Sequence, residues 1–245
     1  MRLGFVLLLI GCLTSCSTGT HYAPVTDIST IERIPKSGVY RVLPGETLYS
    51  IAWRYGLDYR YLAKRNNIAP PYHVDAGQLI YLNGKATQAT RIRVLPSLAE
   101  KKQTVIMKHS VSRPVIYHEI NTPVTSWLWP AKGPVISTYS RLNKGINIGG
   151  RLGAPIFATA QGQVVYSGNG LRGYGNLIII KHNARYLTAY AHNSVVFVKE
   201  GDWVNAGKKI ASMGNTGARQ VMLHFEIRVS GQPVNPLRYL ARSRH

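Results

Sequence analysis

The residues of this chain that are best suited to metal or acid–base chemistry are histidines in its C-terminal half. His182, His192 and His224 stand within or directly after short apolar runs. Imidazole is a common zinc ligand, but catalytic zinc needs three protein ligands and an open position for water. The stretch from Ile120 to Lys199 contains no Asp or Glu. We therefore expect no carboxylate near these histidines to balance a metal charge or to act as a general base.

The elements that must position these histidines are short strands. From Trp127 to Leu240, runs rich in Val, Ile, Tyr and Thr alternate with turns that contain glycine. The clearest runs are Val135–Tyr139, Gln163–Ser167, Leu177–Ile180 and Leu223–Ile227. Many short strands at this spacing predict a mostly antiparallel all-β domain, either a sandwich or an open barrel.

A second, smaller pattern occupies residues 38–83. Tyr40–Leu43 and Gln78–Leu82 are predicted strands, and two helices are predicted between them. In the first helix, Leu48, Ile51, Ala52 and Tyr55 share one face, and Gly56 ends it because glycine tolerates a positive φ. Tyr59, Leu62 and Ala63 form the apolar face of the second helix, which Asn66 ends. The sequence therefore predicts a small α+β module with the order βααβ.

The chain is strongly basic, with 30 Lys and Arg against 10 Asp and Glu and a formal net charge of +20. Such an excess draws a protein to nucleic acid, anionic lipid or an acidic cell wall, or it reflects only a solvated basic surface. No helix-turn-helix, RNP or zinc-finger pattern supports nucleic acid. Residues 84–126 are rich in Thr, Ser, Lys and Arg and predict a basic, flexible linker.

The two cysteines lie near the N-terminus, so they cannot form a disulfide bond that stabilises a folded domain. The apolar run Leu3–Leu13 is too short to span a bilayer but suits the core of a signal peptide. Leu13–Cys16 resembles a lipobox, which implies a signal peptide over residues 1–15, lipidation of Cys16 and a tether over 16–37. The alternative is an ordinary cleaved signal. Ser17 after the cysteine favours an outer-membrane anchor facing the periplasm.

Residues 38–83 resemble the LysM module, which binds glycans containing N-acetylglucosamine. The matching segments are Tyr40–Val42, Gly45–Leu48, Ile51–Ala52, Asn66–Ile68 and Gly77–Leu79. The resemblance implies a shallow groove between the loops Gly45–Leu48 and Ala69–Val74. Its candidate glycan-binding residues are Gly45, Glu46, Thr47, Leu48, Pro71 and Tyr72. The alternative is that residues such as Gly45 and Thr47 only shape turns and caps.

Residues 127–241 resemble the LytM domain, or peptidase family M23, of zinc endopeptidases that cut peptidoglycan cross-links. The matching segments are Gly145–Ile148, Gly153–Ile156, Tyr190–His192 and Leu223–Arg228. Active members hold zinc with an H-x-x-x-D motif and the second His of H-x-H. Here Asn143 and Asn147 occupy the first motif and Met222 the first position of the second, so only His224 and the assisting His192 survive. An amide oxygen is a poor zinc ligand, so we expect no metal, no cofactor and no catalytic residues.

The chain resembles NlpD-like murein hydrolase activator lipoproteins in its lipobox, in its module order and in three further segments. These segments are Leu171–Asn176, Thr188–Asn193 and Val234–Leu240. This resemblance implies a non-catalytic protein that binds peptidoglycan and activates a periplasmic N-acetylmuramoyl-L-alanine amidase during cell separation. The alternatives are a residual zinc endopeptidase and a purely structural anchor between outer membrane and wall. The candidate partner-binding groove is lined by Asn143, Lys144, Asn147, Arg172, His192, Met222 and His224, and Lys181 is expected among its basic neighbours.

Overall fold

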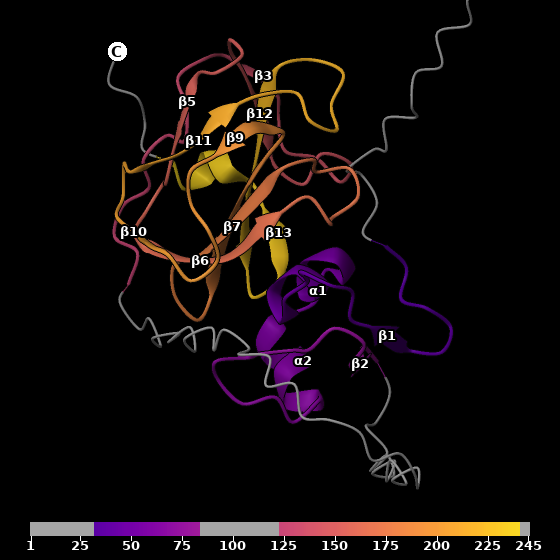
Figure 1. Cartoon of the computed structure of the whole chain (residues 1–245). Coiled ribbons are helices and arrows are strands. Elements are labelled where there is room, and N and C mark those ends of the chain that lie inside the picture. Colours follow the sequence, from indigo (N-terminus) through magenta and orange to yellow (C-terminus); the bar gives the residue numbers. More distant parts are fainter. Residues whose placement is uncertain (1–31, 84–122, 241–245) are drawn as a thin grey trace, which may run out of the picture.

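The computed structural model describes residues 32–83 and 123–240 (Figure 1). The predicted signal peptide, the candidate lipidation site Cys16 and most of the predicted linker lie outside the described residues. The described chain forms a small domain with two helices and a larger domain rich in strands, and the two lie against each other (Figure 1). None of the described helices is long and apolar enough to cross a membrane.

The small domain has the predicted βααβ order, with β1 (Val39–Arg41), α1 (Leu48–Tyr55), α2 (Tyr59–Arg65) and β2 (Leu79–Tyr81). β1 and β2 pair antiparallel and hold the two ends of the module together. Thr47 caps α1 by accepting a hydrogen bond from the backbone N–H of Ser50, and Gly56 ends it at a φ of 64°. Both helix ends therefore fall where local sequence predicts them.

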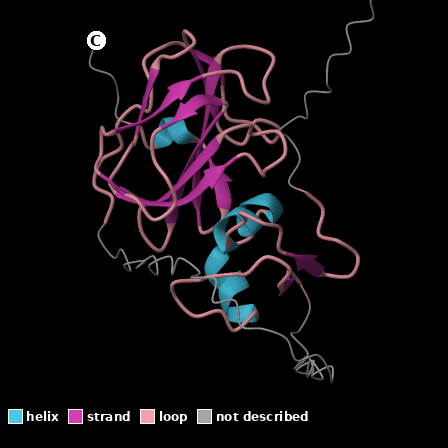
Figure 2. Ribbon diagram, in the orientation of Figure 1, coloured by secondary structure: helices cyan, strands magenta, loops and turns pink. Residues whose placement is uncertain are grey.

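The large domain consists mainly of strands and loops (Figure 2). It is built on an eight-stranded antiparallel sheet in the order β10-β6-β7-β8-β12-β4-β3, with β13 paired to β12. Its strands are β3 (Val135–Ser137), β4 (Ile146–Gly149), β6 (Gly162–Gly168), β7 (Leu177–Lys181), β8 (Tyr186–Ala191), β10 (Trp203–Val204), β12 (Met222–Val229) and β13 (Gln232–Val234). A three-stranded sheet contains β5 (Pro155–Phe157), β11 (Lys209–Met213) and β9 (Asn193–Val196). The predicted fold class is confirmed, and the described part of this domain adds only the 3-10 turn η1 (Pro236–Arg238).

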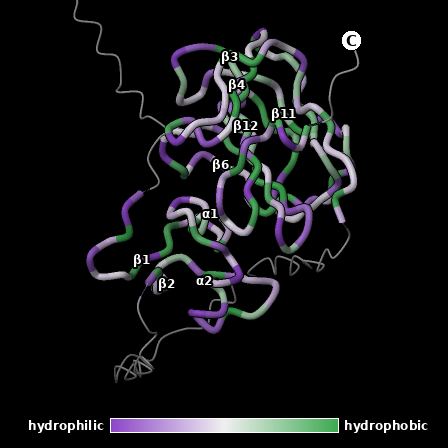
Figure 3. Tube along the Cα trace, turned by 180° about the vertical axis from the view of Figure 1, so that it is seen from behind, coloured by the Kyte–Doolittle hydropathy of each residue, from purple (hydrophilic) through white to green (hydrophobic). Residues whose placement is uncertain are grey.

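The two faces of the large sheet belong to different hydrophobic clusters. Ile178 and Ile180 of β7 pack in one cluster with Leu223 and Phe225 of β12, inside the large domain. Leu177 and Ile179 of β7 pack in the other cluster, which also contains the apolar residues of α1 and α2. Hydrophobic stretches accordingly run through the interior of the large domain, while many of its loops are hydrophilic (Figure 3).

The face of the sheet that meets the small domain also carries the polar side chains of β12. Because successive side chains alternate along a strand, His224, Glu226 and Arg228 lie opposite to Leu223 and Phe225. We call this the site face, and we call the contact between the two domains the seam.

The seam is held by polar contacts as well as by its shared hydrophobic cluster. Arg228 Nη1 donates to the carbonyl of Trp53 at 2.8 Å, and its guanidinium carbon lies 3.5 Å from the centroid of the Trp53 ring. Gln232 Nε2 donates to the carbonyl of Gly56 at 3.0 Å. The Thr47 hydroxyl donates to the carbonyl of Val165 at 3.1 Å. These contacts fix α1 against the sheet.

We predict that Gly231→Ala loosens the seam, whereas Gly153→Ala does not. Both glycines have nearly the same positive φ, +82° and +83°, so both variants carry similar backbone strain of order 1 kcal/mol. A Cβ at Gly231 would lie 2.5 Å from the carbonyl oxygen of Leu57 in the small domain, but one at Gly153 would meet nothing within 4 Å. Small-angle scattering should therefore show a larger radius of gyration for Gly231→Ala alone. Equal scattering from the two variants would contradict the described docking.

Candidate functional site

The centre of the candidate site is a contact between His224 on β12 and Asn147 on β4. The antiparallel register places these two residues directly opposite each other. His224 Nδ1 and Asn147 Oδ1 lie 2.7 Å apart, within hydrogen-bond distance, and His224 is fully buried. Two of the three positions that would hold metal in the peptidase pattern are therefore in contact with each other.

The other two altered positions are also engaged or displaced. Asn143, in the loop between β3 and β4, donates its amide to the backbone carbonyls of Thr138 and Gly145, each at 3.0 Å. Met222 begins β12 opposite Gly149 and offers only a thioether. Thioether and amide groups are poor ligands for zinc, which binds imidazole, thiolate and carboxylate. The residues at these positions therefore do not fit a zinc ion.

The wider surroundings agree with that conclusion. Within residues 32–83 and 123–240, no three His, Cys, Asp or Glu side chains gather in a way that could hold a metal ion. His182 lies elsewhere: its ring nitrogens are within 2.7 Å of the Gln161 carbonyl and 2.8 Å of the Thr188 hydroxyl. It therefore does not replace a missing ligand.

His192 survives at the C-terminal end of β8, but it is shut away from solvent. It is 1% exposed, and its Nδ1 donates to the carbonyl of Thr216 at 2.8 Å. Its Nε2 is buried and has no hydrogen-bond partner among the described residues. Burial, aided by the nearby His224, lowers its pKa to about 4 in spite of the bond to Thr216. His192 is therefore neutral at pH 7.

A carboxylate lies beside the site, so the expectation that no acid would be near it is wrong. Glu226 is fully buried two residues along β12 from His224, and His224 Nε2 donates to its Oε1 at 3.2 Å. The acid-free stretch ends at Lys199 and says nothing about β12, whose alternate residues share a face.

The charge of Glu226 is neutralised within the protein. Arg228 Nε donates to Glu226 Oε2 at 3.0 Å, and the Tyr174 hydroxyl donates to Oε1 at 2.7 Å. Burial acts to raise the pKa of Glu226, but Arg228 and the bonds from His224 and Tyr174 outweigh it and hold the pKa at about 2. A carboxylate committed in this way is not available as a general base.

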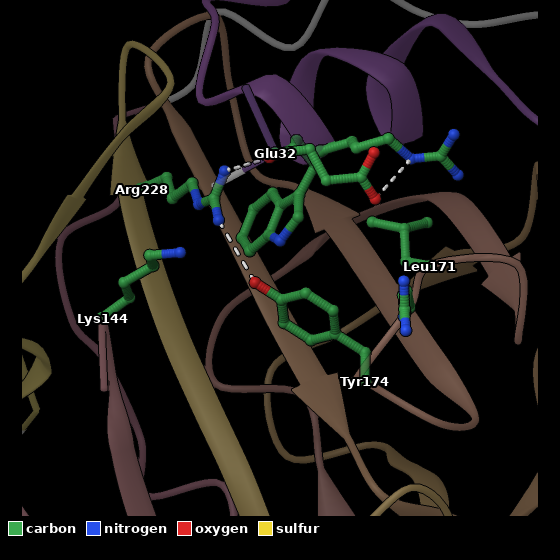
Figure 4. A pocket seen from close by; sticks show the side chains of 8 residues that line it. Glu32, Lys144, Leu171, Tyr174 and Arg228 are labelled. Atoms are coloured by element: carbon green, nitrogen blue, oxygen red, sulfur yellow. Dashed lines mark hydrogen bonds and ion pairs between the residues drawn. The ribbon is translucent and has the colours of Figure 1, made fainter. Parts of the chain in front are cut away.

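The basic residues predicted around the site lie in different places in the structure. Arg172 is exposed, and Lys144 is 5% exposed with a φ of 51°. Both line a hollow of about 20 Å³ at the seam, which Arg228 and Tyr174 also border (Figure 4). Lys181 is not part of it. Its ammonium is buried 5.4–5.8 Å from the ring centroids of three tyrosines in the small domain, Tyr49, Tyr59 and Tyr72.

The two loops predicted to bind glycan come together in the small domain. They line a pocket of about 240 Å³, which we call the loop pocket, and its walls are Gly45, Glu46, Thr47, Tyr49, Pro71, Tyr72, His73, Val74 and Glu200. Five of the six candidate glycan-binding residues are in this lining. The sixth, Leu48, is fully buried in the hydrophobic core.

Glu46 lines the loop pocket, but its carboxylate is bound to its own domain. It accepts hydrogen bonds from the Tyr40 hydroxyl at 2.8–2.9 Å and from the backbone N–H of Leu43 at 2.9 Å. It also forms an ion pair with Arg54 at 2.5 Å. Glu46 therefore shapes the loop. Sequence reasoning missed two lining residues, Tyr49 and Glu200. Glu200 comes from the large domain, and no local pattern links residues so far apart.

Comparisons with known proteins agree with both resemblances. Residues 40–83 match the LysM domain, and residues 141–236 match peptidase family M23. The lipoprotein NlpD/LppB homolog of Pseudomonas aeruginosa is 45% identical over 234 residues, covering 84% of this chain and 78% of that protein. The murein hydrolase activator NlpD of Escherichia coli is 40% identical over 264 residues, covering 84% and 70%. The uncharacterized lipoprotein YgeR of Escherichia coli is 41% identical over 247 residues, covering 98% and 91%.

Burial of His192 predicts that stability falls as the pH is lowered from 6.5 to about 4. Below 6.5 the unfolded histidine binds a proton, but the folded one stays neutral down to a pKa of about 4. The free energy of unfolding therefore falls with pH, by as much as about 3 kcal/mol at pH 4. The buried His182, whose pKa burial also lowers to about 4, acts in the same window. Glu226 contributes at lower pH, because the stabilisation from its lowered pKa is lost as the pH falls from 4.5 to about 2.

The measurement is urea unfolding at several pH values between 4.5 and 6.5, for the unmodified protein and for His192→Gln. The variant should lose roughly half of the pH dependence, because His182 remains. An unchanged pH dependence in His192→Gln would show that His192 takes up its proton in the folded state.

Proposed function

Because this chain belongs to the NlpD family of lipoproteins, which joins a LysM domain to a peptidase M23 domain, we propose that it binds peptidoglycan and activates a periplasmic N-acetylmuramoyl-L-alanine amidase. The observation that carries the proposal is the contact between His224 and Asn147, which closes the peptidase site in a domain that is otherwise fully folded. A protein of this kind acts by binding and not by cleavage.

A residual zinc endopeptidase is the rival enzymatic function. It would require Asn143 and Asn147 to leave their present hydrogen bonds and to serve as metal ligands through neutral amides. It would also require a general base, yet the nearby Glu226 is bound to Arg228 and Tyr174. The geometry supports a non-catalytic role better. Release of muropeptides from sacculi by the purified protein alone would favour the rival.

A purely structural anchor is the second rival. A lipid anchor and a LysM module would suffice for it, and the large domain would then need no functional surface. In the large domain, however, the loop Leu171–Asn176 exposes Arg172 at the rim of the hollow at the seam, while Leu171 and Tyr174 of the same loop are buried. An exposed cation at such a rim favours an acidic partner segment.

Activation needs only a modest difference in binding. If an inhibitory segment of the amidase binds the surface around Arg172 more tightly than it binds its own active site, the open amidase becomes the main population. A few kcal/mol of differential binding are enough for such a shift. His192 and His224 are buried and so are not part of the surface that would meet a partner.

The amidase test uses Arg172→Glu, because this side chain is exposed and its reversal leaves the core intact. Lys144→Glu is a poor probe, because Lys144 is buried. We expect Arg172→Glu to reduce stimulation of the amidase on dye-labelled sacculi about three- to tenfold, by weakening attraction of an acidic segment. Lys208→Glu is the matched control, since this exposed lysine follows β10, which pairs with the start of β6, whereas Arg172 follows the other end of β6. Equal stimulation by both variants would remove the Arg172 surface from the mechanism.

We further propose that Cys16 is lipidated and anchors the protein in the outer membrane, facing the periplasm. Support comes from the lipobox-like Leu13–Cys16 and from the lipoprotein names of the relatives. Acyl chains stabilise anchoring by about 0.8 kcal/mol per buried methylene, so their loss should free the protein. In Cys16→Ala, membrane fractionation should find the protein in the soluble fraction or as an unprocessed precursor. An unchanged distribution between fractions would refute lipidation at Cys16.

A further inference from the structure

The loop pocket is walled by both domains. Eight of its nine lining residues come from the small domain, and the ninth, Glu200, comes from the segment between β9 and β10 of the large domain. Glu200 is exposed at the place where it lines the pocket.

The large domain also positions Tyr72 in this pocket. Tyr72 has a φ of 65°, and its ring centroid lies 5.7 Å from the buried ammonium of Lys181 on β7. The ring packs edge-on against Tyr49 and Tyr59, which face the same ammonium. A cation desolvated among aromatic faces is an attractive contact, so the docked large domain fixes the orientation of Tyr72.

Thr47 is tied to the large domain in the same way. Its hydroxyl accepts the capping bond from Ser50 and donates to the carbonyl of Val165 on β6 at 3.1 Å. Three lining residues of the loop pocket, Thr47, Tyr72 and Glu200, therefore depend on the seam for their position or their presence. Without docking, the pocket would lose Glu200, and Thr47 and Tyr72 would lose the contacts that hold them in position.

The chemistry of this lining suits a sugar chain. Tyr72 is partly exposed and offers an aromatic ring, which combines apolar area with a polar edge, and the buried Tyr49 packs behind it. An ionised carboxylate accepts several hydrogen bonds from hydroxyl groups. Glu200 is the exposed carboxylate in the lining, whereas Glu46 is buried and bound to Tyr40, Leu43 and Arg54.

We propose that the loop pocket is a composite glycan site, in which Glu200 of the large domain accepts hydrogen bonds from hydroxyl groups of an N-acetylglucosamine-containing glycan held by the small domain. The proposal rests on the peptidoglycan binding proposed above and adds the second domain to it. Because binding free energies are reciprocal, glycan binding and docking of the two domains stabilise each other by the same factor. A wall-bound molecule then keeps α1 fixed on the site face, beside Arg228.

The experiment measures binding of chitotetraose to the full chain in detergent by calorimetry. Glu200→Gln keeps the shape of the side chain but weakens it as an acceptor, and we expect a three- to tenfold loss of affinity, as for one charge-assisted hydrogen bond. Lys208→Gln is the control, because this exposed residue lies in the turn between β10 and β11 and is not part of the lining of the loop pocket. It should bind like the unmodified protein.

The seam is tested with the glycine pair. Gly231→Ala should weaken chitotetraose binding at least as much as Glu200→Gln, whereas Gly153→Ala should not weaken it. Adding Glu200→Gln to Gly231→Ala should cause no further loss, because the wall is already displaced. Saturating chitotetraose should also bring the scattering of Gly231→Ala back toward that of the unmodified protein.

The outcomes separate this inference from the proposed function. Unchanged affinity in both Glu200→Gln and Gly231→Ala would overturn the composite site and leave a LysM module that binds glycan alone. Failure of the unmodified protein to bind chitotetraose would also overturn it. Peptidoglycan binding itself is judged separately, by sedimentation of the unmodified protein with isolated sacculi, and absence from the pellet would refute that part of the proposed function.

Discussion

Arg228 projects from β12 into the seam between the two domains, where only 1% of its surface is exposed. A buried guanidinium must be paired and hydrogen-bonded, and removing one partner of such a charge costs about 3–5 kcal/mol. One domain alone does not supply all of its contacts. Glu226 provides the counter-charge from the same strand, while Trp53 of the small domain provides a carbonyl acceptor and an aromatic face. The docking of the two domains and the polar content of the site face are therefore linked through this one side chain.

The same linkage explains how a peptidase-like site persists without two of its three metal ligands. Glu226 joins Arg228 to His224, and His224 in turn meets Asn147 across the strand pair. Each of these buried groups is engaged by another, which avoids the cost of burying unsatisfied polar atoms. The former site has become part of the interior that supports the seam. Arg172, at the rim of the hollow, stays exposed.

Much of the fold follows from local sequence, because its causes are local. The apolar period of Leu48, Ile51, Ala52 and Tyr55 and the stop at Gly56 predict α1 with its correct C-terminal end. Strands such as β7 and β12 follow from runs of β-branched and aromatic residues. The family resemblance identified the altered positions, and their residue types alone argued against a zinc site.

The sequence by itself thus determined the order of the two modules, their elements and the lack of suitable zinc ligands at the positions that hold metal in the peptidase pattern. Only the tertiary structure decided which face of a strand each polar residue occupies and what lies across from it. It placed Glu226 beside His224, removed Lys181 from the basic rim into a cluster of tyrosines, and brought Glu200 to the loop pocket. The physical reason is that strand register and domain docking are set by packing between residues far apart in the chain, and local propensity carries no record of those contacts.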